Sequence, residues 1–384
     1  MMQNQSQISR RNFIAGAALG ATVGISLPSL LGSVAAARPA RYDETQPEPL
    51  LLHRNESPYG LAPAAAKAAH SILTGQANRY PVEEPKALQE AIAKRFGVDK
   101  EMVALGCGSI EILKMATETF CSIPRPAVVA EPTFEAVVSY SRLMHSHAAK
   151  VPLTADHKHD LTRMLHHARL GAGMVFFCNP SNPAGTYIGN HEVEKFVRRL
   201  PRSTVLLADE AYLDYALASD YESCLRYVKE GLPVIVSRTF SKIYGMAGLR
   251  VGYAIGRKDL IKRMTRRRLA NNPNQVATAA ALAALKEDDP FVGRVRTMNA
   301  EVRDFMYREL GNLRIPYIAA ETNFIMIGLG RPAEPMIETL KKRHVLVGRL
   351  FPSMPDHMRV TLGTKPEMER FLKEFKQALG SDVV

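Results

Sequence analysis

Cysteine is scarce in this chain of 384 residues, and long apolar runs are absent from all but its front. The four cysteines show neither CxxC spacing nor a nearby set of ligands, so no metal site is expected. Packing is the expected role of Cys107 and Cys178, although an oxidising compartment would permit disulfides. Beyond residue 37 there is no run of eighteen apolar residues, which predicts a soluble mature protein.

An excess of basic residues gives the chain a formal net charge of +12. The lysines and arginines are scattered among acidic residues, and their densest cluster, Arg263 to Arg268, has the pattern of one solvated helix face. A nucleic-acid partner is therefore not expected. The positive charge instead favours the binding of anionic small molecules.

The front of the chain, up to residue 37, differs in kind from the rest. The sequence Ser9-Arg10-Arg11-Asn12-Phe13-Ile14 leads into an uncharged run rich in alanine and glycine that ends in Ala35-Ala36-Ala37. These features predict a Tat-type signal peptide over residues 1–37, with cleavage near Ala37. The Tat export machinery is then a partner, and the mature protein is periplasmic or otherwise exported. The run is also long enough to span a bilayer, so membrane tethering stays open.

The mature chain is expected to form a large domain with a smaller partner. About 347 residues remain after cleavage, which is more than one core usually supports. Prolines between residues 38 and 63 predict an extended arm over the surface. The expected division is an arm that joins the small domain, a large domain and a small domain, over residues 38–78, 79–288 and 289–384.

Helical stretches alternate with short apolar runs from residue 86 to residue 285, a pattern typical of a parallel α/β sheet. The expected strands are 127–129, 174–177, 205–208, 234–236 and 252–255. A long helix, strands and further helices follow, which predicts a small α+β domain. Ligands of such sheets bind at the carboxyl ends of the strands, so the loops after these runs are the candidate site.

A single lysine, Lys242, follows the apolar run Val234-Ile235-Val236 in a setting of serine, threonine and glycine, eight residues before Arg250. A lysine can form a Schiff base with an aldehyde cofactor when burial and nearby cations lower its pKa. Hydroxyls and a guanidinium can bind a phosphate. The stretch therefore suggests pyridoxal phosphate, and an ordinary basic loop after a strand is the alternative.

Two other loops carry groups that suit a pyridine phosphate. Gly106-Cys107-Gly108-Ser109 can bring backbone N–H groups at a helix start to a phosphate, or it can be a tight turn with Ser109 as N-cap. The loop Asn179-Pro180-Ser181-Asn182-Pro183-Ala184-Gly185 can hold the Asn182 amide towards a phenolate oxygen, or it can be a plain turn.

Asp209 follows the apolar run that ends at Ala208. A buried carboxylate needs a cation, which a protonated pyridine nitrogen supplies, although an N-cap would explain the same residue. Tyr212 can donate to the phenolate oxygen or lie at the edge of the core. Phe134 can stack on the pyridine ring or pack in the core.

Taken together and in this order, the motifs resemble those of the fold type I pyridoxal-phosphate aminotransferases of class I/II, above all the histidinol-phosphate aminotransferase group. The resemblance covers nearly all the mature chain. The motifs are Asn55-Glu-Ser-Pro58, Asn78-Arg-Tyr-Pro81, Gly106-Cys-Gly-Ser109, Asn179-Pro-Ser-Asn-Pro-Ala-Gly185, Asp209-Glu-Ala-Tyr212, Ser241-Lys242, Ala247-Gly-Leu-Arg250, Thr322-Asn-Phe324 and Arg359-Val-Thr-Leu-Gly-Thr364. The resemblance implies a large domain with a mostly parallel seven-stranded sheet flanked by helices, and a small α+β domain.

The resemblance also implies roles for individual residues. Lys242 forms the Schiff base and moves the proton, while Asp209 pairs with the pyridine nitrogen of pyridoxal 5'-phosphate. The other implied cofactor contacts are Phe134 on the ring, Asn182 and Tyr212 at its oxygen, and Gly108, Ser109, Ile110, Ser241 and Arg250 at the phosphate. A homodimer is implied, with Tyr80 reaching the phosphate of the other subunit. Arg359 binds the substrate's carboxylate or phosphate, with Arg349 and Asn323 nearby.

The implied activity is transfer of an amino group from an amino acid or related amine to a 2-oxo acid by a ping-pong mechanism. The alternatives are another pyridoxal-phosphate reaction on the same scaffold, such as an amino acid decarboxylase or lyase, and a cofactor-binding module without turnover. Two positions depart from the family pattern: Ile110 stands where an aspartate is common, and the loop Arg349–Pro355 is shorter. Because export separates the protein from histidine biosynthesis in the cytoplasm, an amino acid donor is favoured over histidinol phosphate.

Overall fold

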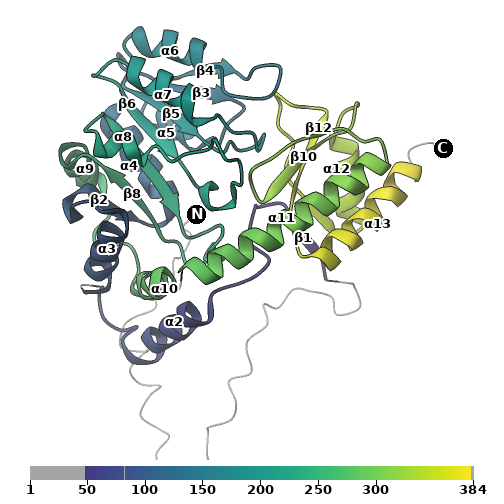
Figure 1. Ribbon diagram of the computed structural model, residues 1–384, viewed down its shortest axis with the longest axis horizontal. Helices are drawn as coiled ribbons and strands as arrows, with labels where there is room; N and C mark the ends of the chain where they lie inside the picture. The colour runs from purple at the N-terminus through teal and green to yellow at the C-terminus, as the bar shows by residue number, and fades with distance from the viewer. Residues whose placement is uncertain (1–47, 82, 287, 382–384) are drawn as a thin grey trace, which may run out of the picture. The chain divides into compact units, whose positions relative to one another are not determined.

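A sheet of seven strands organises the larger part of the protein (Figure 1). The computed structural model describes residues 48–81, 83–286 and 288–381; the predicted signal peptide and the start of the arm lie outside these ranges. The strand order is β2-β8-β7-β6-β5-β3-β4, and β8 is antiparallel to both of its neighbours while the other pairs are parallel. The strands are β2 (Val103–Gly106), β3 (Ala127–Glu131), β4 (Ala148–Pro152), β5 (Met174–Cys178), β6 (Val205–Asp209), β7 (Val234–Thr239) and β8 (Gly252–Gly256). The mostly parallel seven-stranded sheet is thereby confirmed.

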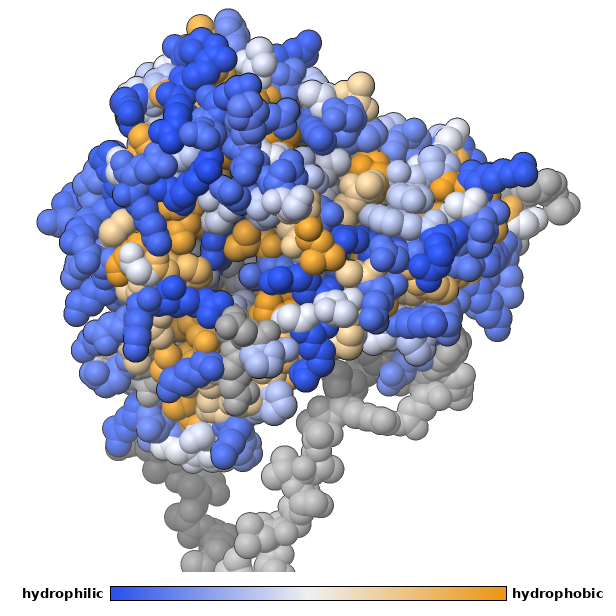
Figure 2. Space-filling view, in the orientation of Figure 1, coloured by the Kyte–Doolittle hydropathy of each residue, from blue (hydrophilic) through white to orange (hydrophobic). Residues whose placement is uncertain are grey.

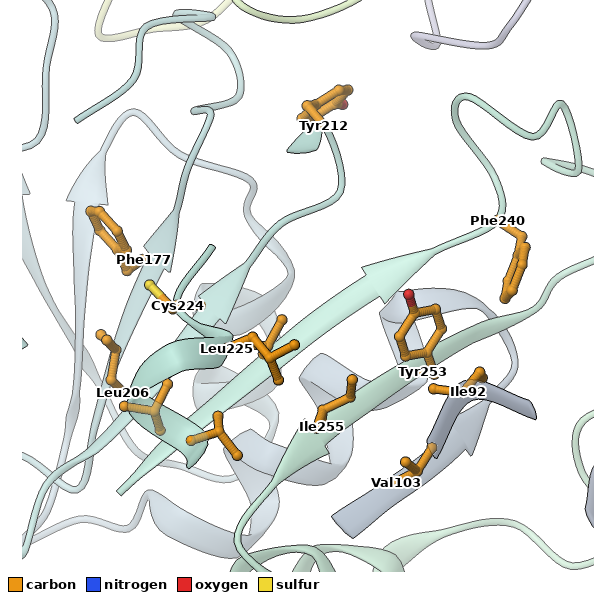
Figure 3. Close-up of a cluster of buried hydrophobic side chains, with 14 of the residues drawn as sticks. Ile92, Val103, Phe177, Leu206, Tyr212, Cys224, Leu225, Phe240, Tyr253 and Ile255 are labelled. Carbon is orange, nitrogen blue, oxygen red and sulfur yellow. The ribbon is translucent and has the colours of Figure 1, made fainter. Parts of the chain in front are cut away.

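The central strands are apolar because both of their faces are covered. Successive side chains of a strand point to opposite faces, and β5 shows this directly. Its Val175 and Phe177 lie in one hydrophobic cluster, whereas Met174 and Phe176 lie in another. Figure 3 shows part of the first cluster, with Phe177 and Leu206 among its labelled members.

Helices cover each face of the sheet, as the two clusters require. The first cluster is covered by α2 (Pro63–Gly75), α3 (Glu83–Phe96), α6 (Leu161–Arg169), α7 (Asn190–Arg199), α8 (Leu225–Lys229) and α10 (Gln275–Lys286). The second cluster is covered by α4 (Gly108–Phe120), α5 (Ala136–Leu143) and α9 (Lys258–Met264).

Helix α2 lies in the last part of residues 38–78, which the sequence assigned to an arm that joins the small domain. Pro63 stands in its first turn, where the missing N–H has no intrahelical partner, and alanines with strong helix propensity follow. Ala65 and Ala69 are buried and contribute to the first cluster together with Ala281 of α10. This part of the expected arm therefore packs on the large core.

The small domain is built from two short sheets and three helices. The strands are β9 (Tyr317–Ile318), β10 (Phe324–Gly328) and β12 (His357–Thr361) in an antiparallel sheet, with β1 (Leu50–Leu52) and β11 (Val345–Val347) in a parallel pair. The helices are α11 (Asp288–Asn312), α12 (Glu334–Lys342) and α13 (Lys365–Ser381). Because β1 belongs to the arm, the arm adds a strand to this domain.

Helix α11 belongs to both cores (Figure 1). Phe291 and Val295 in its first half pack in the large core, while Val302 and Met306 in its second half pack in the core of the small domain. The change of core therefore falls inside this helix, between Val295 and Val302.

The strand ends bring the candidate loops together. Thr239 at the end of β7 pairs with Gly252 at the start of β8, so residues 240–251, which include Lys242, form a loop closed at its base. Gly252 is needed there because a Cβ would lie 2.5 Å from the backbone nitrogen of Ser109. The lysine loop and the start of α4 are thus held in contact.

The surface in Figure 2 is mostly hydrophilic, with small apolar patches between the charged side chains. Within residues 48–81, 83–286 and 288–381, no helix has both the length and the apolar character needed to cross a bilayer.

We predict that Phe371→Ala lowers the free energy of unfolding by about 3–5 kcal/mol, because truncating a fully buried aromatic residue leaves a cavity. Phe371 has no exposed surface and stacks on Phe375 at 5.4 Å between ring centroids. Urea unfolding measures the change. Leu143→Ala, at a side chain that is 76% exposed, is the control and should shift the value by less than about 0.5 kcal/mol. Equal losses in the two variants would contradict the buried position of Phe371.

Candidate active site

A cavity of about 640 Å³ lies where the strand-end loops, the arm and the small domain meet. The predicted residues that line it are Ser109, Ile110, Phe134, Asn182, Asp209, Tyr212, Ser241, Lys242, Arg250, Arg349 and Arg359. A second cavity of about 660 Å³, beside α6 and α7, contains none of the predicted residues. The first cavity is therefore the candidate active site.

Three predicted residues do not line the cavity. Gly108 lies behind Arg250, with a φ of +69°, and a Cβ there would collide with the Arg250 guanidinium. Asn323 is buried and donates through Nδ2 to the backbone carbonyls of Asn55 and Glu56, at 3.1 Å each. Tyr80 is 78% exposed.

Lys242 is held by backbone carbonyls of the arm. Its Nζ donates to Asn55 O at 2.8 Å and to Arg54 O at 3.2 Å, and it lies 5.7 Å from the centre of the Tyr212 ring. Burial, followed by the charge of Arg359, lowers the pKa of Lys242 to about 8. The neutral form of this amine is therefore more populated near neutral pH than it is for an exposed lysine.

Asp209 ends β6 and is only 3% exposed. Its Oδ1 has no hydrogen-bond partner within the described part of the chain. Burial raises the pKa of Asp209 to about 7, against a hydrogen bond from the backbone of Ala211. A buried carboxylate with an open lone pair is a site for a cation or a charged N–H donor.

The neighbouring acid, Glu210, is fully engaged elsewhere. It accepts from Arg238 at 2.9 and 3.0 Å, from the Ser223 hydroxyl and from the backbone N–H of Cys224. This buried ion pair has a structural role, because each charge has several partners. Of the two adjacent carboxylates, only Asp209 is available to the cavity.

Asn55 joins the arm to both domains, although the sequence assigned it no role. Its Nδ2 donates to the Tyr212 hydroxyl at 2.9 Å, and its backbone N–H donates to Thr361 Oγ1 at 2.9 Å. The residue is 2% exposed and has a φ of 54°, a conformation that asparagine tolerates better than most residues. The resemblance of Asn55-Glu-Ser-Pro58 to a family motif was the signal that could have singled it out.

Asn182 and Arg359 form a second contact between the domains. Arg359 Nη1 donates to Asn182 Oδ1 at 2.7 Å, which leaves the Asn182 amide N–H groups free for another acceptor. Arg359 Nη2 donates to His53 O at 3.1 Å, while Nε has no partner in the described residues. Burial lowers the pKa of Arg359 to about 10, so its guanidinium is charged at neutral pH.

The start of α4 and the lysine loop form one anion-binding end of the cavity. Arg250 Nη1 donates to Ser241 Oγ at 3.2 Å, and Thr239 Oγ1 donates to the same oxygen at 2.9 Å. The alternative interpretation, in which Ser109 caps α4, is excluded: the cap position is Cys107, whose N–H donates to Glu111 at 2.6 Å. Ser109 is therefore inside the first turn, where backbone N–H groups have no intrahelical acceptor.

These groups fit pyridoxal phosphate. The buried carboxylate of Asp209 suits a protonated ring nitrogen, the anion-binding end suits a phosphate, and the Lys242 amine suits an aldehyde. Ile110, where the family often has aspartate, lines the cavity and leaves the backbone of this turn intact. Fold and site together define a pyridoxal-phosphate-dependent enzyme of fold type I.

Comparison with known proteins gives the family. Residues 47–375 match the family "Aminotransferase class I and II". The chain is 38% identical to histidinol-phosphate aminotransferase of Moorella thermoacetica, with 85% of each chain covered, and 34% identical to that of Symbiobacterium thermophilum, covering 86% of this chain and 90% of the relative. The structure of histidinol-phosphate aminotransferase from Sinorhizobium meliloti in complex with pyridoxal-5'-phosphate is similar, with a TM-score of 0.81 and 25% identity, covering 86% of this chain and 90% of that one.

The chain belongs to the class I and II aminotransferases. It is a pyridoxal-phosphate-dependent aminotransferase, as the sequence predicted, and the decarboxylase, lyase and binding-module alternatives are not favoured.

We predict that Asp209 makes the cofactor-free protein less stable as the pH rises from 4 to 7. The pKa of Asp209 is about 7 in the folded protein, against a reference value of 3.8 that applies to the unfolded chain. Between these values the folded state binds more protons than the unfolded state, so the free energy of unfolding falls as the pH rises. Asp209→Asn removes this contribution. Urea unfolding at several pH values measures it as the difference between wild type and variant, which cancels the other titrating groups. A difference that does not change with pH would contradict the raised pKa.

Proposed function

We propose that this aminotransferase moves an amino group from an amino acid or related amine to a 2-oxo acid in a ping-pong sequence, with Lys242 as the catalytic base. The observation that supports this role is the position of the Lys242 amine in one cavity with the buried Asp209 carboxylate and the Arg359 guanidinium. Its pKa of about 8 lets Nζ take a proton from the donor's α-carbon and release it again near neutral pH.

Pyridoxal phosphate supplies, when bound, an aldehyde for the amino group and an electron-withdrawing ring. Asp209 would hold the ring nitrogen in its protonated form, and Tyr212 and Asn182 would hold the ring oxygen. Phe134, which is 37% exposed at the cavity, would cover a face of the ring. The phosphate would be held by Ser109, Ser241, Arg250 and the backbone of Gly108 and Ile110.

We assign the donor's carboxylate to Arg359, because a guanidinium binds a carboxylate through two parallel hydrogen bonds. Arg359 already donates hydrogen bonds from Nη1 to Asn182 and from Nη2 to the backbone carbonyl of His53, which fixes the plane of its guanidinium. Asn323 would act through the arm, since it donates to the Asn55 carbonyl, which also accepts from Lys242, and to the next carbonyl, that of Glu56. The named relatives act on histidinol phosphate, whereas an exported enzyme is separated from that cytoplasmic intermediate, so we propose an amino acid donor.

The proposed assembly is a homodimer with the active site at its interface. Tyr80 would then reach the phosphate of the other subunit, which agrees with its 78% exposure in a single chain. Residues 1–37 are proposed to be a Tat-type signal that delivers the protein to the periplasm, with release or tethering as the two possible end states.

We predict that Lys242→Ala abolishes transamination and the visible absorbance of the lysine-bound cofactor, because Nζ is the amine that binds the cofactor and moves the proton. Lys258→Ala, at an exposed lysine that pairs with Asp99, is the control and should keep both. The assay adds single amino acids and follows conversion of the cofactor to its aminated form, together with released CO2. CO2 without conversion would favour a decarboxylase, no response to any donor would favour a binding module, and a persisting band would contradict the role of Lys242.

We predict that the double variant Arg10→Lys/Arg11→Lys is no longer exported, because the twin arginine is the feature that the Tat machinery reads. Cell fractionation in a host with that machinery measures periplasmic, membrane and cytosolic protein. Arg38→Lys/Arg41→Lys, which makes the same change after the predicted cleavage site, is the control and should be exported normally. Wild-type protein of full length in the cytosol would contradict the signal.

A further inference from the structure

We propose that Glu135 selects the donor's side chain: by pairing with Arg349 at the rim of the cavity, it reserves the site for amino acids with one carboxylate and an uncharged, apolar side chain. This inference rests on the proposed transamination of an amino acid. It adds to that function the class of amino donor and the residue that selects it.

The pair joins the two domains at the cavity mouth. Arg349 follows β11 of the small domain, and Glu135 directly precedes α5 of the large domain. Arg349 Nη2 lies 2.7 Å from Glu135 Oε2, and Nη1 donates to Leu350 O at 3.2 Å. Both terminal nitrogens of this guanidinium therefore already have an oxygen partner from the chain.

Lys341, a second cation that lines the cavity from the small domain, also has a carboxylate partner. Lys341 and Glu338 both line the cavity and stand one helical turn apart on α12. Their side chains form an ion pair at 3.5 Å. In contrast, Arg359 has no carboxylate partner in the described residues and is only 8% exposed. Of Lys341, Arg349 and Arg359, Arg359 is thus the buried cation that is left for a substrate carboxylate.

An apolar wall separates Arg359 from Arg349. Phe351 is 3% exposed, and its ring centroid lies 5.2 Å from the Arg359 guanidinium carbon and 4.4 Å from that of Arg349. Ile337 and Val347 line the same side of the cavity. A donor held at Arg359 therefore meets hydrocarbon before it meets a second charge.

Apolar donors and donors with a second anionic group differ in how they interact with this wall. An apolar side chain can cover Phe351, Ile337 and Val347 and gains by leaving water. A second phosphate or carboxylate must displace Glu135 from Arg349, or else leave its own charge beside hydrocarbon and next to a carboxylate. Like charges at close range oppose binding, so the Glu135 carboxylate acts against donors with a second anion. This places Arg349, which the sequence put among the substrate contacts, in a specificity pair.

Removing Glu135 is not expected to unfold the protein. The side chains of Arg349 and Glu135 are 52% and 56% exposed, and ion pairs exposed to this degree contribute little to stability. A change in donor preference can therefore be separated from a folding defect.

The test compares L-leucine with O-phospho-L-serine as donors for the cofactor-loaded enzyme. Wild type should have the higher kcat/KM for L-leucine. In Glu135→Gln the ratio of the two kcat/KM values should shift about tenfold towards O-phospho-L-serine, mainly through KM, because Arg349 can then bind the second anion. The shift should be lost in the double variant Glu135→Gln/Arg349→Met.

Glu230→Gln is the matched control, since it removes a carboxylate that pairs with Arg198 and makes the same change in net charge. Its donor ratio should equal that of wild type. Calorimetry measures the same selectivity without turnover, as the ratio of the dissociation constants of succinate, which has two carboxylates, and 4-methylpentanoate, which has one and an apolar chain. Preference of wild type for O-phospho-L-serine, or an unchanged ratio in Glu135→Gln, would overturn the inference. If no donor is turned over but calorimetry shows the expected selectivity, the proposed reaction would be contradicted and the role of Glu135 would be supported.

Discussion

The active site depends on the hydrogen bonds of Asn55, a residue of the arm. Its carbonyl accepts from Lys242 of the large domain and from Asn323 of the small domain, while its side chain donates to Tyr212 and its N–H donates to Thr361. Because the residue is buried, each of these bonds would be costly to leave unmade. One residue of the arm thus fixes the lysine relative to both domains, and the cavity takes its form from that arrangement.

Electrostatics at the site follow from burial before any ligand is considered. Burial lowers the pKa of Lys242 and of Arg359 and raises the pKa of Asp209, so each group is displaced towards its neutral form. Glu210, one residue from Asp209, forms an ion pair with Arg238 and does not face the cavity. Within the described residues, the cavity therefore holds charges without an ion-pair partner, and a phosphate and a charged ring nitrogen are the groups that would compensate them.

Much of the fold and of the site could be predicted because the signals are local. Apolar runs marked five of the seven strands of the large sheet, all but β2 and β4, and the rule that ligands bind at strand ends placed Lys242 and Asp209 in one site. Contacts between distant segments carried no such signal. Asn55 and Lys242 are 187 residues apart, and the sequence around Glu135 does not indicate that its partner is Arg349. Residue type alone left open whether Ser109 caps α4, and the structure excludes this because the cap position is Cys107, whose N–H donates to Glu111.

The reversed strand β8 has a consequence for how the protein takes up its cofactor. Because β8 runs back along β7, the segment that carries Lys242 begins and ends on paired residues, Thr239 and Gly252. The entropy of closing this loop is lost when the sheet forms, not when a ligand arrives. Capture of the cofactor then requires little ordering of the backbone around the lysine, and more of the binding energy is available to hold the ligand.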